Sequence, residues 1–386
     1  MKTGFFLIFV SIVLAVYAAV NYYIFIRGWQ ALSGLITLRY WYLGAFLFLS
    51  SSYILARFLE YYAPSPVSRM FVWIGSFWLA AMLYFFLIVF LVDIVRMFNY
   101  FFHFLPLSES LFYGKLKIIS ISAATGIVAI TILAGYINAV NVRVKRIDLQ
   151  IAKHAGTLHQ LNIVMASDIH LGNLVGKNRM GSIVAQINAL NPDIVLFAGD
   201  VTDEDLRPVI ENNLGAMITS IRSKYGVYAI TGNHEYIGGA VKAVKYLEEH
   251  GVKMLRDTAI TIDNSFCLAG RNDKDSRRFT GIERKPFDEV LKDADKNLPL
   301  ILMDHQPFNL ELSENAGVDL HLSGHTHNGQ MWPLNYITGA LFELDWGYKK
   351  RGNTNYYVSC GAGTWGPPVR TGNRPEIVNI VLHFME

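Results

Sequence analysis

The sequence is poor in charged residues and in cysteine, and each shortage excludes a class of protein. Asp, Glu, Lys and Arg make up only 17% of the 386 residues and hydrophobic residues 52%, which is too apolar for an ordinary soluble enzyme. The net charge of +3, without a basic block interleaved with aromatic residues, argues against a nucleic-acid partner. The two cysteines, Cys267 and Cys360, need no disulfide and are expected to be buried thiols, so the redox compartment stays open.

The hydrophobic excess is concentrated before residue 141. A membrane-spanning helix needs about 20 mostly apolar residues, because the hydrocarbon core is about 30 Å thick. Four stretches approach or meet this length, and aromatic residues crowd their ends, as expected at membrane interfaces. The sequence therefore predicts a transmembrane region of four helices over residues 1–141. The stretches are Phe5–Ile26, Tyr42–Ala56 (extended through Tyr40 and Trp41), Val72–Val92 and Ile118–Val140.

Other interpretations of these stretches are weaker. The first one has the charge pattern of a signal peptide, but signal sequences have shorter apolar segments that stand alone. Four spans place both chain ends on one side, where seven basic residues stand against five on the other. This excess favours the cell (inner) membrane with the catalytic half in the cytoplasm. The seven are Lys2, Arg57, Arg69, Arg143, Lys145, Arg146 and Lys153, and the five are Arg27, Arg39, Arg96, Lys115 and Lys117.

From about Leu161, after an expected linker over 142–160, short apolar runs alternate with amphipathic helices. A polar cluster follows directly on each of five predicted strands. Loops after strand C-termini converge on one edge of layered α/β sheets, so we expect these clusters to form one site. A charged stretch, Arg271–Arg284, is expected to be an exposed loop. The strands are Leu161–Ala166, Ile194–Ala198, Val227–Ile230, Leu300–Met303 and Leu320–Leu322, and the helices are Asn178–Leu190, Leu206–Ile221 and Ala240–His250.

The five clusters supply carboxylates, imidazoles and an amide, which are the ligands that Mn, Fe and Zn prefer. Each cluster alone is weak evidence, because Gly-Asp and Asn-His after a strand are most often turns. All five in order predict two divalent metal ions, with Asp200 able to bridge them through its two oxygens. The candidate ligands are Asp168, His170, Asp200, Asn233, His305, His325 and His327.

Two such metals suit phosphoester hydrolysis by a metal-activated hydroxide. His234 is not needed as a ligand and is a candidate to protonate the leaving oxygen or to brace the phosphate. Asp203 and Glu235 are candidates to orient the ligand imidazoles.

The motifs Asp168-x-His170, Gly199-Asp200, Gly232-Asn233-His234-Glu235, His305 and Gly324-His325-x-His327 resemble those of the calcineurin-like metallophosphoesterase superfamily. The resemblance covers residues 161–386 and implies a four-layer α/β sandwich of two mixed β-sheets flanked by helices. It also implies that His234 is catalytic and that the ligands form two sets. The first set is Asp168, His170, Asp200 and His327, and the second is Asp200, Asn233, His305 and His325. Where many members carry Arg after Gly-Asp-x-x-Asp, this chain has Glu204, which puts a phosphate-clamping arginine there in doubt.

The spans and the tail from Gly361 to Arg370 resemble the transmembrane branch of that superfamily, and some relatives act on lipid-linked substrates such as UDP-diacylglucosamine. In the tail, Arg370 is a candidate phosphate contact and Trp365 a candidate contact for a base or an acyl chain, with a structural turn as the alternative. We therefore predict a membrane-anchored hydrolase of a phosphoester or pyrophosphate in a lipid or lipid-linked nucleotide. The alternatives are an anchored phosphodiesterase or phosphatase for a soluble nucleotide or phosphoprotein, and a non-catalytic sensor or scaffold. The complete ligand set argues against the last.

Overall fold

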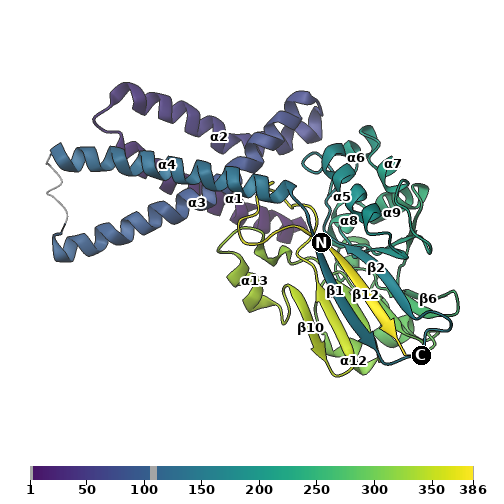
Figure 1. Cartoon of the computed structure of the whole chain (residues 1–386). Coiled ribbons are helices and arrows are strands. Elements are labelled where there is room, and N and C mark those ends of the chain that lie inside the picture. The colour runs from purple at the N-terminus through teal and green to yellow at the C-terminus, as the bar shows by residue number, and fades with distance from the viewer. Residues whose placement is uncertain (1–2, 105–110, 386) are drawn as a thin grey trace. The chain divides into compact units, whose positions relative to one another are not determined.

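The computed structural model describes residues 3–104 and 111–385 (Figure 1). The chain divides into two compact units, of which the first comprises Met1–Tyr136 with Gly366–Val369 and the second Ile137–Trp365 with Arg370–Glu386. Four long helices account for the first unit, and two β-sheets with shorter helices account for the second.

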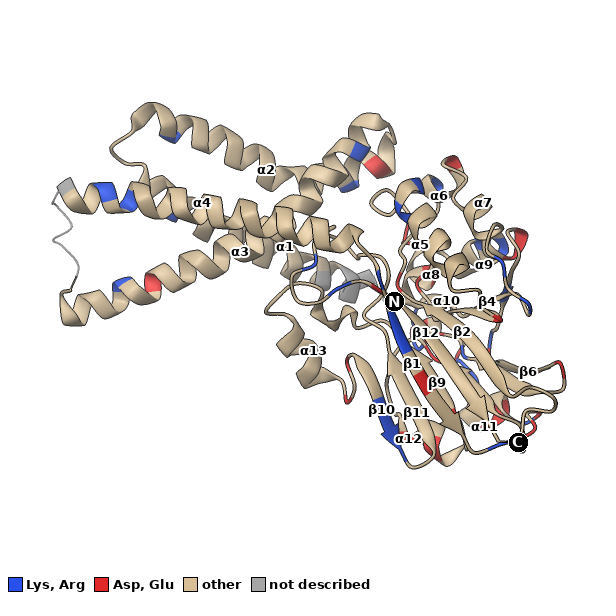
Figure 2. Ribbon diagram, viewed as in Figure 1, with Lys and Arg blue, Asp and Glu red and all other residues tan. Residues whose placement is uncertain are grey.

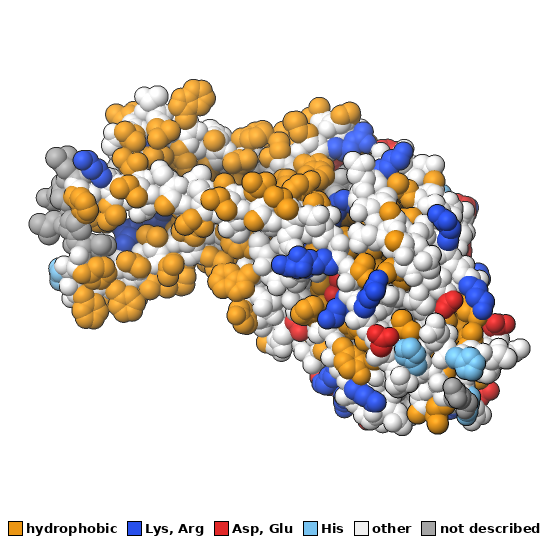
Figure 3. All heavy atoms as spheres, in the orientation of Figure 1, with side chains coloured by type: hydrophobic (Ala, Val, Ile, Leu, Met, Phe, Trp, Pro, Cys, Tyr) orange, Lys and Arg blue, Asp and Glu red, His pale blue; other side chains and the backbone are white. Residues whose placement is uncertain are grey.

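The four N-terminal helices are each long and apolar enough to cross a membrane, which confirms the predicted apolar helices. Between 11% and 17% of the residues in their most apolar windows are buried, so most apolar side chains face outward (Figure 3). Figure 2 shows how few charged side chains these helices carry. Lys2, one of the basic residues counted above, lies outside the described residues. The helices are α1 (Thr3–Ala31), α2 (Ile36–Tyr62), α3 (Pro66–Phe102) and α4 (Leu111–Val140).

Small and polar residues add to the contacts of an apolar cluster, Ile24, Phe46 and Trp78, inside this helical unit. The indole Nε1 of Trp78 donates to Asn21 Oδ1 at 3.0 Å in a buried position between α1 and α3. Gly75 of α3 packs so closely on α2 that a Cβ there would lie 2.5 Å from Tyr53 Cα. Because lipid is as apolar as leucine, close backbone approach and hydrogen bonds of this kind hold membrane helices together.

Two six-stranded mixed sheets build the second unit. In the first sheet β2 to β5 run parallel, whereas β12 runs antiparallel to β2 and places β1 at the edge. In the second sheet β7, β8, β9 and β11 run parallel, and antiparallel strands close both edges. The first sheet has the order β1 (Arg143–Ile151), β12 (Glu376–Phe384), β2 (Gln160–Ala166), β3 (Ile194–Phe197), β4 (Val227–Ala229), β5 (Val252–Met254). The second has the order β10 (Gly347–Arg351), β11 (Thr354–Val358), β9 (Leu320–Ser323), β8 (Leu300–Met303), β7 (Phe266–Gly270), β6 (Thr258–Ile262).

The largest apolar core lies between the two sheets, where alternate side chains of facing strands such as Ile163 and Met303 meet. The other face of the first sheet packs on α5, α7 and α9, and the other face of the second packs on α11. This is the four-layer sandwich that the resemblance implied. The helices are α5 (Lys177–Ala189), α6 (Arg207–Glu211), α7 (Gly215–Ile218), α8 (Asn233–Gly238), α9 (Ala240–Glu249), α10 (Ser276–Thr280), α11 (Phe287–Val290), α12 (Glu311–Asn315), the 3₁₀-helix η1 (His327–Gly329) and α13 (Asn335–Leu341).

Three local expectations were wrong. The expected linker over 142–160 contains β1, whose nine residues pair with β12 more than 200 positions downstream, and the alternation of apolar and polar residues from Ile147 to Ile151 is a local strand signal that the linker expectation overlooked. The single helix expected over Leu206–Ile221 is two short helices, because Asn213 adopts a left-handed backbone with φ of 48° between them. The charged stretch from Arg271 is not fully exposed, since Arg271 and Asp273 are buried.

Candidate metal centre

The seven candidate ligands lie in the loops that follow five strands. The loop after β2 carries Asp168 and His170, and the loops after β3 and β4 carry Asp200 and Asn233. In the second sheet, His305 follows β8, while His325 and His327 follow β9. The two sheets stack so that these loops meet at one edge, and the structure brings all seven side chains together.

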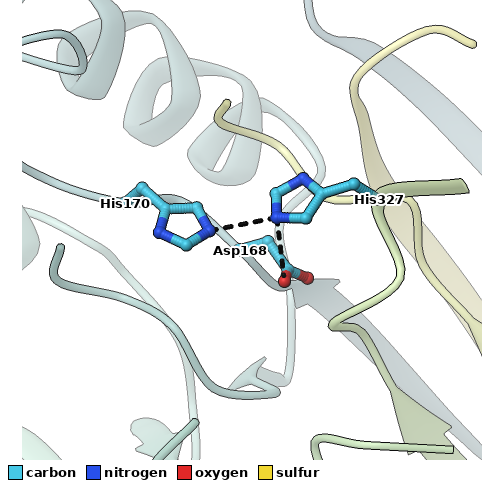
Figure 4. Close-up of side chains that lie close together, drawn as sticks. All are labelled: Asp168, His170 and His327. Carbon is cyan, nitrogen blue, oxygen red and sulfur yellow. Dashed lines mark hydrogen bonds and ion pairs between the residues drawn. The ribbon is translucent and has the colours of Figure 1, made fainter. Parts of the chain in front are cut away.

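Asp168, His170 and His327 form one group that could hold a metal ion (Figure 4). The Nε2 atoms of His170 and His327 lie 3.1 Å apart, and His327 Nε2 lies 3.5 Å from Asp168 Oδ1. The ligand atoms of this group all lie within 4.8 Å of one another.

Asp200, His305 and His325 form a second such group. His305 donates from Nδ1 to the Ala198 carbonyl at 2.7 Å, which leaves Nε2 to face Asp200 Oδ2 at 3.1 Å. His325 Nδ1 lies 2.8 Å from Asn233 Oδ1, so the amide joins this group.

One carboxylate lies between the two groups. Asp200 Oδ2 is 3.1 Å from His305 Nε2 in the second group and 3.9 Å from His170 Nε2 in the first. The other oxygen, Oδ1, accepts from the backbone N–H of His234 at 2.9 Å, which fixes the carboxylate in place. Its position between two sets of imidazoles suits a ligand shared by two cations.

His234 and Asp203 flank the first group. Asp203 Oδ1 lies 3.1 Å from His234 Nδ1 and 3.7 Å from His170 Nδ1, so it faces both imidazoles, as the sequence predicted for an orienting residue. Burial lowers the pKa of His234, but the charges of Asp200 and Asp203 outweigh it and raise that pKa to about 9. His234 therefore carries a proton at neutral pH.

The backbone of the site is held in uncommon conformations. Five ligands have a positive φ, a left-handed geometry that residues other than glycine rarely adopt and that clusters at functional sites. Glycines leave room around them: a Cβ at Gly232 would lie 2.1 Å from Asp200 Oδ1, and one at Gly324 would lie 2.2 Å from Asp168 Oδ2. The five ligands are Asp168, His170, Asp200, His325 and His327.

Burial and neighbouring charges shift the pKa values of the ligands in different directions. Burial opposes charge on Asp200, but His305 and its neighbours hold the pKa of Asp200 well below its ordinary value. The same attraction overcomes burial at His305 and raises its pKa well above the usual one. Burial and the nearby His305 charge lower the pKa of His325 to about 3, and burial, His170 and Arg370 lower that of His327. His325 and His327 therefore favour the neutral form that metal ligation requires. His305 has to release its proton when a cation binds, and burial raises the pKa of Asp168, whose ionised form a bound cation would favour.

Unpartnered buried nitrogens support a cation site. Buried polar groups in proteins almost always have a hydrogen-bond partner. Among the described residues, His305 Nε2 is one of the buried side-chain nitrogens without such a partner. His305 Nε2 points at carboxylate oxygens, as a metal-ligating nitrogen would, so the residues present fit divalent cations.

Glu235 and Arg370, two candidate auxiliary residues, support the ligand loops through contacts other than those expected. Glu235 does not contact an imidazole: its carboxylate accepts from the backbone N–H groups of Asp200, Thr202 and Gly232 at 2.7–3.0 Å and joins two ligand loops. Arg370 is fully buried and donates to the carbonyls of Cys360 and Gly363, with Nη2 3.3 Å from His327 Nδ1. It lies behind a ligand with the tail folded around it, which favours the structural alternative over a phosphate contact.

Trp365 remains a candidate substrate contact, since it is exposed and its ring lies 5.8 Å from that of His234. The rest of the tail braces the site: the backbone N–H groups of Ala362 and Gly363 donate to the carbonyls of Ser167 and Asp168. Glycines at positions 361 and 363 leave room for this close approach, since a Cβ at Gly363 would lie against the Ile169 carbonyl.

Sequence reasoning missed the ion pairs beside His305. Arg271 and Arg284 each bind Asp304, at 2.8 Å and 3.0 Å, and so anchor the residue that precedes a ligand. It also missed Asn373, which donates to the carbonyls of His327 and Asn328. No local pattern marks these residues, because their partners are distant in sequence.

A two-sheet sandwich with paired Asp/His groups at one edge defines a metallophosphoesterase. The calcineurin-like phosphoesterase family model matches residues 161–329. Over 225 residues the chain is 33% identical to an uncharacterized metallophosphoesterase of Aquifex aeolicus, covering 58% of this chain and 85% of that protein. The chain therefore belongs to the calcineurin-like metallophosphoesterases.

The chain is also similar to a protein that is named as a transmembrane protein. The chain is 32% identical over 269 residues to a transmembrane protein with metallophosphoesterase domain of Danio rerio, covering 66% of this chain and 61% of the fish protein's length. It is 25% identical over 297 residues to a UDP-2,3-diacylglucosamine pyrophosphatase of Chlamydia trachomatis, covering 61% of this chain and 87% of that protein. Among solved structures, an NAD nucleotidase of Haemophilus influenzae aligns with a TM-score of 0.37 and 16% identity, covering 54% and 46% of the two chains.

Proposed function

We propose that this chain is a membrane-anchored, dinuclear-metal hydrolase of a phosphoester or pyrophosphate bond in a lipid or lipid-linked nucleotide. The observation that carries the proposal is the Asp200 carboxylate, which lies between two separate groups of imidazoles. Arrangements with one shared carboxylate suit two cations a few ångströms apart, and paired cations suit displacement at phosphorus.

In this proposal Asp168, His170, Asp200 and His327 hold one ion, and Asp200, Asn233, His305 and His325 hold the other. Divalent Mn, Fe or Zn fits this mixture of oxygen and nitrogen donors. When bound, such ions neutralise phosphate oxygens and lower the pKa of water.

His234 is the proposed general acid. Its Nδ1 faces Asp203 at 3.1 Å, which orients the ring and leaves Nε2 for the substrate. With its pKa raised to about 9 by Asp200 and Asp203 against the effect of burial, it holds a proton to donate to the leaving oxygen. Trp365, which lies beside this ring, is placed to contact the leaving group.

The four apolar helices keep the site beside membrane lipids, which supports an amphiphilic substrate. The Chlamydia relative is named for hydrolysis of the pyrophosphate of UDP-2,3-diacylglucosamine, so nucleotide-linked lipids are the first substrates to test. We place the catalytic half in the cytoplasm on the excess of basic residues flanking the spans. A reporter enzyme fused after Glu386 tests this, since activity of a periplasm-only reporter would contradict it.

The metal claim is tested with the full chain in detergent. Chelation should abolish hydrolysis of bis(p-nitrophenyl) phosphate, and Mn should restore it. His234→Asn should lower the restored rate by roughly a hundredfold or more while the bound metal stays unchanged. His250→Asn is the matched control, because His250 directly follows α9 and bonds to the Tyr246 carbonyl instead.

Hydrolysis that survives full chelation would overturn the two-metal mechanism. Loss of the diesterase activity in both histidine variants would show that folding, not His234 chemistry, was disturbed. Faster cleavage of a soluble nucleotide or phosphoprotein than of UDP-diacylglucosamine would favour the soluble-substrate alternative.

A further inference from the structure

The second unit exposes apolar residues around one short helix. In α13 and its flanks no described residue between Trp332 and Lys350 is buried, although most of this segment is apolar. Tyr336 is 69% exposed and Leu341 68% exposed. α13 contacts η1 but leaves its large apolar side chains exposed, which is unusual in a soluble domain and marks an interaction surface. We call this surface the apolar rim and define it as Trp332, Tyr336, Ile337, Leu341, Trp346 and Trp365.

The apolar rim is rich in tryptophan. The chain has seven tryptophans, four of which lie before residue 80. The other three, Trp332, Trp346 and Trp365, all belong to the rim, and each is about half exposed. Tryptophan and tyrosine are enriched where one end of the ring is in lipid and the other in water.

The rim is bound tightly to the metal centre. The Thr326 hydroxyl, between two ligand histidines, donates to the Asp345 carbonyl at 2.5 Å, and Thr338 of α13 donates to the Asp345 carboxylate at 3.0 Å. Gln330 exchanges two 3.0 Å hydrogen bonds with the backbone of Trp365. The rings of Phe342, next to the rim, and His325 lie 5.9 Å apart. The segments that carry the rim are therefore bonded to the loops that carry the ligands.

The chain itself indicates what covers this surface. Its own four helices are long and apolar enough to span a bilayer, so the second unit is tethered at a lipid surface at high effective concentration. Exposed Lys350 on β10, beside the rim segment in sequence, adds a charge that anionic headgroups attract.

We propose that the apolar rim docks the catalytic unit on the bilayer in which its own helices are anchored, and so brings the metal centre to the headgroup level. Interfacial docking requires aromatic and aliphatic side chains a few ångströms deep in the lipid, which is what α13 and the three tryptophans offer. The inference depends on the membrane helices and not on the identity of the substrate, so it can fail or hold independently of the proposed reaction.

The test uses the full chain in vesicles of phosphatidylethanolamine and phosphatidylglycerol. Ile337→Cys carries a bimane fluorophore on the rim, and Val241→Cys carries it on α9, where Val241 is 74% exposed outside the rim. Both native cysteines are buried, so the introduced thiol takes the label. Nitroxide-bearing phospholipid should quench the label at 337 several-fold more strongly than the label at 241. The unfolding temperature of each labelled variant serves as the folding check.

Each other outcome overturns the proposal. Equal, weak quenching by lipid at both positions, with strong quenching by aqueous iodide, would mean that the rim stays in water. A label at 337 shielded from both nitroxide lipid and iodide would mean that protein covers the rim, either this chain's own helices, a second copy or a partner.

Discussion

In the four N-terminal helices apolar side chains face outward and polar ones such as Asn21 and Ser52 are buried, whereas in the two-sheet unit apolar side chains form the core. The two-sheet unit also buries carboxylates and imidazoles, and gathers them at one edge. In each unit, residues whose burial is unusual for their type indicate the surroundings that the unit requires. Exposed leucine and phenylalanine predict lipid around the helices, and buried aspartate and histidine predict cations at the sheet edge.

The largest expected effect concerns the buried charge of the second unit. Asp200→Asn should reduce hydrolysis by roughly a thousandfold and lower the bound metal, because a neutral amide cannot be shared by two cations as a carboxylate can. Rates and metal content of the purified chain measure this. Asp205→Asn is the control, since Asp205 is a surface acid paired with Arg207. Full activity in the Asp200 variant would contradict the claim that the buried carboxylate binds cations needed for hydrolysis.

A second prediction concerns a buried imidazole away from the metal centre. His321 is neutral between Ser313 and Ser323, and burial lowers its pKa from 6.5 to about 4. The unfolded chain therefore binds a proton more readily. The free energy of unfolding should therefore fall by about 3 kcal/mol in total as the pH is lowered from 6.5 towards 4. The apparent unfolding temperature should fall more steeply over this range in the wild type than in His321→Gln, and parallel profiles would contradict the prediction.

A third prediction concerns Arg370 behind His327. Arg370→Lys keeps the charge but cannot reach the carbonyls of Cys360 and Gly363 as the guanidinium does. Metal affinity should weaken by about ten- to hundredfold, as for other groups that position a ligand. Titration of the chelated protein with Mn, followed by activity, measures this. An unchanged affinity would mean that Arg370 serves only the fold of the tail.

The smallest expected effect tests the helical unit. Asn21→Ala removes the acceptor of Trp78 and should destabilise the helices by about 0.6–1 kcal/mol, the typical value for a hydrogen bond between membrane helices. Unfolding of the full chain in mixed micelles measures it. Thr125→Ala is the control, because Thr125 is exposed and bonds within its own helix. Equal effects would show that buried polar groups have no special role in this unit.

Sequence patterns predicted the elements that depend on neighbours in the chain. The strands before each polar cluster and α5 lie within a few residues of their expected places, since hydrophobic periodicity is a local property. The four long helices contain the expected apolar stretches but extend beyond them, as α3 does by ending at Phe102 and not at Val92. The pairing of β1 with β12 and the burial of Arg271 against Asp304 were not predictable, because each depends on a partner distant in sequence.

For the metal centre, the sequence alone determined which side chains are available and that each follows a strand, because residue type and local propensity are written along the chain. Only the tertiary structure decided that Asp200 lies between two groups of imidazoles, that Arg370 is turned inward and that the ring of Trp365 lies beside that of His234. Those features depend on how two sheets stack and how the tail crosses them. Such long-range packing is the sum of many weak contacts, and no single stretch of sequence contains it.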